Sequence, residues 1–227
     1  MTASTHLTFR AANNNDVDTI VELVESAYRG DASRVGWTTE ADFLDGRRTG
    51  SDDVLAQIAR PRSRILLAER DGELLASAHV ADEDGAGYFG MFSVQPGLQN
   101  TGIGKSMLAE AERIAREEWK LPSMRMTVID IRAELIAWYE RRGYSLTTNF
   151  EPFPYDDPKF GLPKVKGLKF VLLRKETAMI RKLKSGEYRL YSRKKDPDTG
   201  KRRNLGTFKT RKAAEKHEQD VQYFQRH

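Results

Sequence analysis

The segment GYFGMFSVQPGLQNTGIGKSML, Gly87 to Leu108, decides the fold of this chain. An apolar run with high β propensity ends at Val94, and Pro96 cannot continue a β ladder. A glycine-rich loop follows, and from Gly102 the apolar residues change to helical spacing. The segment therefore predicts a strand, a tight turn, a glycine-rich loop and a helix that runs to about Trp119. The helix would bury one face made of Ile103, Met107, Ala111, Ile114 and Ala115.

The glycine-rich loop has the properties of an anion site. Backbone N–H groups exposed by Gly102 and Gly104 would lie at the positive end of the helix dipole. Two common phosphate motifs do not fit. A P-loop that ends in Gly-Lys-Ser needs glycine where Gln99 stands, and a dinucleotide fingerprint needs glycine at Met107.

Two blocks do fit one family. Gln99, Gly102 and Gly104 form Gln-x-x-Gly-x-Gly after a Val-x-Pro strand end, and LIAWYERRGY follows at Leu135 to Tyr144. With these blocks the sequence resembles the GCN5-related N-acetyltransferase (GNAT) family from about Leu7 to Lys175. The resemblance implies a mixed, mostly antiparallel sheet flanked by helices. It also implies transfer of an acetyl group from acetyl-CoA to an amine acceptor in a ternary complex.

The flanking sequence predicts strands interleaved with helices, which is an α/β pattern. Asp71-Gly72 between two apolar runs predicts a β hairpin. We expect a polar loop over residues 29–51 and an aromatic, proline-rich loop over 150–166. The expected strands are 7–10, 64–70, 73–81, 88–94, 124–129, 144–148 and 168–173, and the expected helices are 17–28, 52–59, 102–119 and 133–141.

The resemblance also assigns cofactor residues. Backbone groups of the strand end would pair with the acetyl and pantetheine portion of acetyl-CoA, and one N–H there would polarise the thioester carbonyl. The loop would surround the diphosphate. Core packing explains Phe92 and Val94 equally well. The predicted cofactor residues are Phe92, Ser93, Val94, Gln99, Asn100, Thr101, Gly102, Ile103, Gly104 and Lys105.

Tyr139 matches the tyrosine that many GNAT members place near the CoA sulfur. A proton donor is needed there, because a thiolate leaves as the amine attacks. The alternative is an interfacial aromatic beside Trp138. We therefore predict Tyr139 as the catalytic acid.

Two positions depart from the family pattern. Arg132 stands where many relatives have a CoA-binding asparagine, and Thr127 stands where the branch that acetylates protein N-termini often has a glutamate base. The residues that could instead serve as the base that deprotonates the amine are Asp82, Glu83 and Asp130. The alternative is that each of them is a solvated surface acid.

Two segments should shape the acceptor pocket by the same resemblance. The loop Glu151 to Pro163 carries Tyr155, Asp156 and Asp157, which would attract an ammonium group or remain solvated. The segment Ala27 to Glu40 would form the opposite wall, with Trp37 either stacking on the acceptor or anchoring the loop.

Composition excludes several classes of site. The chain has 0 Cys, so disulfides, thiolate metal sites and a cysteine nucleophile are ruled out, and no metal site is predicted. The start MTASTHLTFR lacks the apolar stretch of a signal peptide, and no segment reaches the ~18 apolar residues of a membrane span. We expect a cytoplasmic protein without a membrane partner.

Charge divides the chain into an expected acetyltransferase domain, 1–177, and a small basic β-β-β-α module, 178–227. The module holds 15 Lys and Arg against 6 Asp and Glu, a net of +9, and the remainder holds 23 against 27, a net of −4. Arg189, Tyr191 and Arg193 share one strand face. With GxFxTxxxA at Gly206 to Ala214, the module resembles the arm-type DNA-binding domain of phage integrases.

Nucleic-acid binding, protein binding and solubilisation remain alternatives for this module. The alternative for the whole chain is a binding protein that has a degraded CoA-fold domain and acts through its basic module.

Overall fold

The computed structural model describes residues 6–29, 31–176, 179–195, 199–214 and 216–217. The chain divides into two compact units, one ending at Lys175 and the other beginning at Glu176. None of the helices in the described residues has the length and apolarity to cross a membrane.

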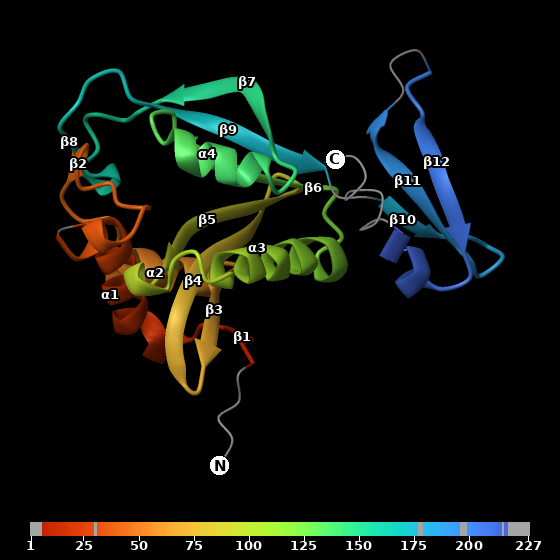
Figure 1. The fold of residues 1–227 in the computed structure, drawn as a ribbon, viewed down its shortest axis with the longest axis horizontal. Helices are drawn as coiled ribbons and strands as arrows, with labels where there is room; N and C mark the ends of the chain where they lie inside the picture. The colour runs from red at the N-terminus through yellow and green to blue at the C-terminus, as the bar shows by residue number, and fades with distance from the viewer. Residues whose placement is uncertain (1–5, 30, 177–178, 196–198, 215, 218–227) are drawn as a thin grey trace. The chain divides into compact units, whose positions relative to one another are not determined.

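The larger unit contains a seven-stranded sheet in the order β1-β3-β4-β5-β6-β9-β7 (Figure 1). The pairs β1–β3, β3–β4, β4–β5 and β7–β9 are antiparallel, and β5–β6 is parallel. The mixed, mostly antiparallel sheet is therefore confirmed. The strands are β1 (Thr8–Ala11), β3 (Ser63–Arg70), β4 (Glu73–Glu83), β5 (Ala86–Val94), β6 (Ser123–Ile129), β7 (Ser145–Pro152) and β9 (Lys169–Glu176), with a separate pair β2 (Leu44–Asp45) and β8 (Leu162–Pro163).

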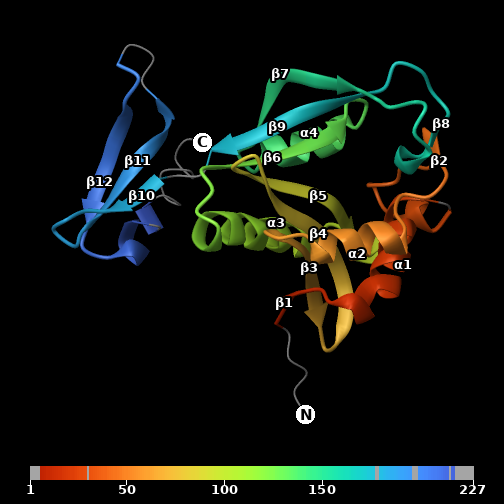
Figure 2. The same ribbon diagram turned by 180° about the vertical axis from the view of Figure 1, so that it is seen from behind.

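Helices cover both faces of this sheet because its central strands alternate apolar side chains between the two faces. On β3, Ile65 and Leu67 pack with α1 (Val17–Tyr28) and α2 (Ser51–Ala59). Leu66 and Ala68 belong to the other core, with α3 (Ile103–Arg113) and α4 (Ala133–Glu140). Accordingly, α3 lies in front of the sheet in Figure 1 and α2 lies in front of it in Figure 2.

Several predicted boundaries differ from the structure. The helix expected over 102–119 is α-helical only to Arg113 and continues as a π-helix over Ile114–Glu118. The strand expected to end at residue 148 extends to Pro152, because β7 pairs with β9 after a register shift between Leu146 and Phe150. The β3–β4 turn is as predicted, with positive φ at Asp71 (53°) and Gly72 (83°).

A bulge in β5 shapes the middle of the sheet. Ser77 faces Ser93 and His79 faces Gly90, so that two residues of β5 oppose one of β4. One of the two, Met91, has a φ of 44°. The parallel β5–β6 pair is recorded only at Gly87↔Met124 and Tyr88↔Arg125, and beyond these pairs both strands line a cavity.

The smaller unit is an antiparallel sheet of β10 (Met179–Lys182), β11 (Tyr188–Lys195) and β12 (Arg202–Phe208). Residues 211–214 and 216–217 are helical, and the N–H of Ala213 donates to the hydroxyl of Thr210 at 3.2 Å. Leu190 and Ala214 are each 0% exposed and form its centre. The part of the module's predicted helix that follows residue 217 lies outside the described residues.

Candidate active site

The start of α3 has the backbone geometry expected of the predicted anion site. Gly102 precedes the helix with a φ of 92°, and Asn100 has a φ of 69°, so the loop turns sharply into the helix. The first helical hydrogen bond runs from Ser106 N to Gly102 O, at 3.1 Å. The amides before Ser106 have no acceptor within the helix, and no side chain caps them. They are placed to bind an anion.

A cavity of about 300 Å³ lies beside this helix start. Seven of the ten predicted cofactor residues line it, namely Phe92, Val94, Gln99, Asn100, Gly102, Gly104 and Lys105. The side chains of Ser93 and Ile103 are buried, and the hydroxyl of Thr101 donates to Leu98 O at 2.6 Å. These three residues therefore offer a ligand their backbone rather than their side chains.

Gln99 has a positioning role that its motif did not reveal. Its Oε1 accepts from Trp37 N at 2.9 Å, and its Nε2 donates to Thr38 Oγ1 at 2.8 Å. These bonds hold the segment around Trp37 against the end of β5. Trp37 and Thr38 consequently line this cavity and not the one where an acceptor wall was expected.

Three cationic side chains line the same cavity. Lys105 was predicted, whereas Arg141 and Arg142 were missed. The guanidinium of Arg142 lies 3.4 Å from the ring centroid of Trp138 and donates to Trp138 O at 2.7 Å. The sequence feature that could have identified them is the Arg141-Arg142 pair, which follows Tyr139 by two and three positions. A diphosphate would meet helix amides and three cations here.

A second cavity, of about 430 Å³, lies between the diverging parts of β5 and β6. Phe92 lines both cavities. Tyr139 lines this one and is only 4% exposed, with its ring centroid 5.0 Å from Trp138 and 5.9 Å from Tyr144. Burial raises the pKa of Tyr139 well above its usual value, so that the hydroxyl stays protonated. Tyr139 therefore both packs against aromatic neighbours and lines the cavity.

The hydroxyl of another tyrosine reaches the bulge from α1. Tyr28 donates to the carbonyl oxygen of Phe92 and lines the second cavity. Burial also raises the pKa of Tyr28 and of Tyr88, whose ring lies on the same wall. These neutral hydroxyls were not singled out by sequence analysis, because α1 and β5 meet only in the folded chain.

Glu40 lies at the buried end of this cavity with three arginines around its carboxylate. Glu40 Oε2 is 2.5 Å from Arg29 Nη1 and 3.7 Å from Arg48 Nε, and its Oε1 is 2.9 Å from Arg132 Nη1. Burial opposes ionisation, but the charges of Arg132, Arg48 and Arg29 outweigh it and keep the pKa of Glu40 below its usual value. Arg132, the departure from the family asparagine, thus binds Glu40.

The predicted base candidates do not line either of these cavities. Asp82 pairs with Arg62 at 2.6 Å, Glu83 pairs with Arg125 at 3.1 Å, and Asp130 accepts from a backbone amide. Two carboxylates do line the larger cavity, Glu40 and Glu151.

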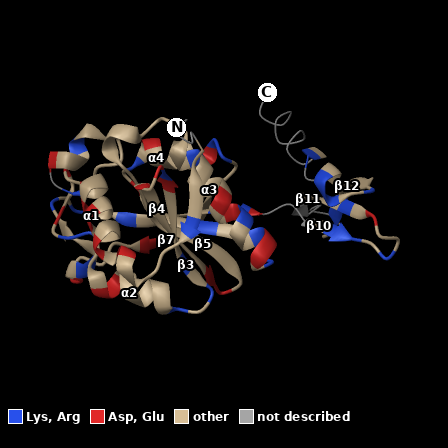
Figure 3. Ribbon diagram, turned by 90° about the horizontal axis from the view of Figure 1, so that it is seen from below, with Lys and Arg blue, Asp and Glu red and all other residues tan. Residues whose placement is uncertain are grey.

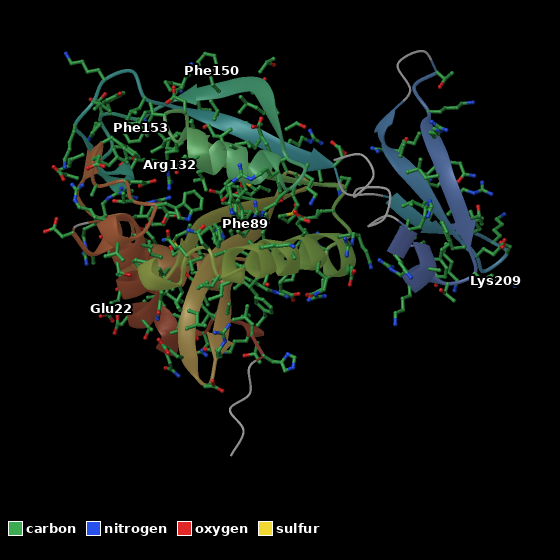
Figure 4. All side chains as sticks on the ribbon, in the orientation of Figure 1. Glu22, Phe89, Arg132, Phe150, Phe153 and Lys209 are labelled. Carbon is green, nitrogen blue, oxygen red and sulfur yellow. The ribbon has the colours of Figure 1, made fainter. Side chains whose placement is uncertain are left out.

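Apart from Glu151, the 151–163 loop supplies the cavity with apolar and aromatic side chains. Phe153, Phe160 and Pro154 line it, while Tyr155, Asp156 and Asp157 do not. The hydroxyl of Tyr155 instead bonds the backbone of Val165 and Leu168. In Figure 4, Phe89, Arg132 and Phe153 lie in the space between β5 and the β7–β9 pair. The described residues contain no cluster of His, Asp and Glu suited to a metal ion.

A sequence model of the acetyltransferase (GNAT) family matches residues 21–144, more than half of the chain. The chain belongs to this family. No curated protein matches it in sequence. The matched region lies within the larger unit.

Solved structures share the fold of this GNAT protein. The ribosomal-protein-S18-alanine N-acetyltransferase of Escherichia coli is 13% identical, with a TM-score of 0.57 over 77% of this chain and 96% of its own. The ribosomal-protein-alanine N-acetyltransferase of Brucella melitensis is 18% identical, with a TM-score of 0.57 over 75% and 99%. The yncA protein of Salmonella typhimurium, solved with acetyl-CoA, is 20% identical, with a TM-score of 0.56 over 76% and 94%.

Acetyl-CoA as the co-substrate agrees with both the family and the residues. One similar structure contains acetyl-CoA, and another, from Thermoplasma acidophilum, contains coenzyme A. In this chain the unpaired helix amides and the three cations suit a diphosphate, and the absence of a side chain at Gly104 keeps the cradle open beside Phe92.

Proposed function

We propose that this protein transfers an acetyl group from acetyl-CoA to an amine by direct attack in a ternary complex. The observation that carries the proposal is that two cavities meet at Phe92. One has the amides and cations that suit a diphosphate, and the other has room and polar groups for an acceptor. A thioester bound at Phe92 would have its CoA portion in one cavity and the acceptor amine in the other. Holding both reactants in place reduces the entropy cost of bringing them together.

Each wall has a chemical role in this proposal. The amides at the start of α3, with Lys105, Arg141 and Arg142, hold the diphosphate. The backbone of Phe92 to Val94, at and after the β5 bulge, binds the acyl portion, and an N–H there stabilises the developing oxyanion. Tyr139 donates its proton to the departing thiolate. Acetyl-CoA supplies the activated acyl group.

The proposed proton acceptor is Glu151, acting on the amine through water. Glu40 is unsuited, because three arginines stabilise its carboxylate form. Glu151 lines the cavity and is exposed, and its carboxylate forms no hydrogen bond or ion pair with the side chains or backbone that the structure describes. Glu151→Gln should lower kcat by about 10- to 100-fold, most strongly below the pKa of the free amine. Unchanged turnover at pH 7 would remove this role.

The enzyme proposal is tested with the full chain, acetyl-CoA and a broad amine panel. Thiol release should be stimulated at least tenfold by one or more amines, and Tyr139→Phe should abolish most of that stimulation. The alternative, a degraded CoA-binding domain, predicts acetyl-CoA binding without stimulated turnover by any amine. That result would contradict the proposal.

For the smaller unit we propose nucleic-acid binding, and one observation favours it. Arg181, Arg189 and Thr207 are register partners on the sheet face opposite Leu190, and Arg181 lies 6.0 Å from the ring of Tyr191 on the same face. Figure 3 shows Lys and Arg along these strands. Cations beside an aromatic ring suit phosphates and stacked bases. The resemblance to the integrase arm-type domain and the cytoplasmic location also stay predictions.

A further inference from the structure

The guanidinium of Arg48 is placed differently from those of the other arginines around Glu40. Arg48 lines the larger cavity, and its side chain is 32% exposed. Its Nε is 3.7 Å from Glu40, and its guanidinium carbon is 5.3 Å from the ring centroid of Tyr28. Neither Nη group has a hydrogen-bond partner among the described residues. Both Nη groups of this cavity-lining residue are therefore available as donors.

The surrounding charges do not satisfy Arg48. Both oxygens of Glu40 are already engaged, by Arg29 and Arg132, and Arg132 Nη2 donates to Thr38 O at 2.8 Å. Glu40 thus faces three guanidiniums, and the Glu25 carboxylate also acts on Arg48, which leaves a net charge of +1 for these five side chains. A second donor, Arg29 Nη2, is buried without a partner. An excess of buried positive charge is costly unless an anion offsets it.

The backbone that carries Arg48 is held in place from α1. Oε1 of Glu25 accepts from the N–H of Arg48 at 2.6 Å and from that of Thr49 at 3.0 Å. Arg48 is consequently positioned before any ligand arrives, which is the property of a binding side chain. The neighbouring Arg47 is exposed and lines neither cavity, so it offers a matched control.

Another part of the cavity wall is aromatic. Phe153 stacks on Phe170 with 5.4 Å between ring centroids, and Phe160 lies 6.0 Å from Phe170. All three rings line the cavity. A volume of about 430 Å³ suits a small molecule with one apolar group.

From this arrangement we infer that the acceptor is an α-amino acid with an apolar side chain, whose carboxylate binds the free fork of Arg48. This inference rests on the proposed acetyl transfer. Arg48 and Arg132 both lie within 5.5 Å of the ring of Tyr28, whose hydroxyl binds the carbonyl of Phe92. A carboxylate held there keeps an α-amine close to the acyl site. Polyamines are disfavoured, because their additional ammonium groups meet the same cations.

The test compares acceptors that differ only in the carboxylate. The full chain is assayed with phenylalanine, leucine and methionine, each beside its α-amide and its decarboxylated amine. A two-pronged, charge-assisted hydrogen bond predicts that kcat/KM for the acid exceeds that for the amide by about 10- to 100-fold. Arg48→Gln should bring this ratio close to one, Arg48→Lys should retain part of it, and Arg47→Gln should leave it unchanged.

Two controls keep the inference separate from the enzyme proposal. Acetyl-CoA affinity and the far-ultraviolet circular dichroism of Arg48→Gln show whether the variant folds, and Arg48→Lys supplies the same comparison if it does not. If no acceptor is acetylated, the proposed function fails. Calorimetry of the same ligands with the CoA-loaded protein then decides the inference. Tighter binding of the acid than of its amide supports it. An amide or amine preferred to, or equal to, the acid overturns it.

Discussion

A glutamate at Gly104 should weaken acetyl-CoA binding more than any other single change in the loop. Gly104 lies in the first turn of α3 and lines the smaller cavity. A Cβ at this position would lie 3.0 Å from Phe92 Cζ and 3.6 Å from Trp138 Cζ2. A longer side chain is therefore directed into the space between the loop and these rings.

The magnitude follows from charge and distance. A carboxylate about 5 Å from one phosphate charge, at an effective dielectric constant of about 20, costs about 3 kcal/mol. The dissociation constant of acetyl-CoA should rise by about 100-fold for Gly104→Glu. Gly104→Ala adds only the contact with the end of the Phe92 ring, so it should raise the constant a few-fold. The effect of Glu should also shrink as salt increases.

Isothermal titration calorimetry of acetyl-CoA measures both variants. Gly97→Glu is the matched control, because a Cβ at Gly97 meets nothing within 4 Å and Gly97 does not line this cavity. Equal affinities for Gly104→Glu and Gly97→Glu would refute the assignment of the loop to the diphosphate.

Three further predictions concern other parts of the chain. Tyr139→Phe removes only the hydroxyl, so kcat should fall by about 10²- to 10⁴-fold with acetyl-CoA affinity unchanged, and equal turnover in pre-steady-state assays would leave Tyr139 as a packing residue. Burial lowers the pKa of His79 from 6.5 to about 4, so the folded state should lose about 3 kcal/mol of stability as pH falls from about 6.5 to 4. Urea titrations should show a flatter dependence of stability on pH for His79→Asn. The same pH dependence in both proteins would contradict the role of His79. In the smaller unit, Lys201→Gln with Arg203→Gln should reduce the slope of log K against log salt for DNA or RNA by up to about two units, as fluorescence anisotropy would show, whereas no binding at low salt would reject the proposal for this unit.

Local patterns predicted those parts of the molecule whose interactions are close in sequence. The Asp71-Gly72 turn, the helix after Gly102 and the helix ending before Gly143 depend on residues within a few positions of one another. Helical spacing could not show that α3 passes into a π-helix, because the apolar face continues through Ile114 and Ala115. The extension of β7 was missed for a related reason, since its exposed residues show no alternation.

The acceptor side of the site was largely beyond sequence reasoning. Glu40 and Arg132 are 92 positions apart, and each resembles an ordinary surface charge until the fold buries Glu40 and leaves only 10% of the Arg132 side chain exposed. The base candidates Asp82 and Glu83 likewise have partners that are distant in sequence, since they pair with Arg62 and Arg125. Long-range charge pairing, unlike a glycine-rich loop, leaves no local signature.

The most direct test of the account is mass spectrometry of the products that the full chain forms from acetyl-CoA and the acceptor panel. The account predicts an acceptor heavier by one acetyl group on its amine, formed together with free CoA in equal amounts, and lost with Tyr139→Phe. Tight acetyl-CoA binding by a correctly folded chain, with no acetylated amine from any acceptor, would contradict it.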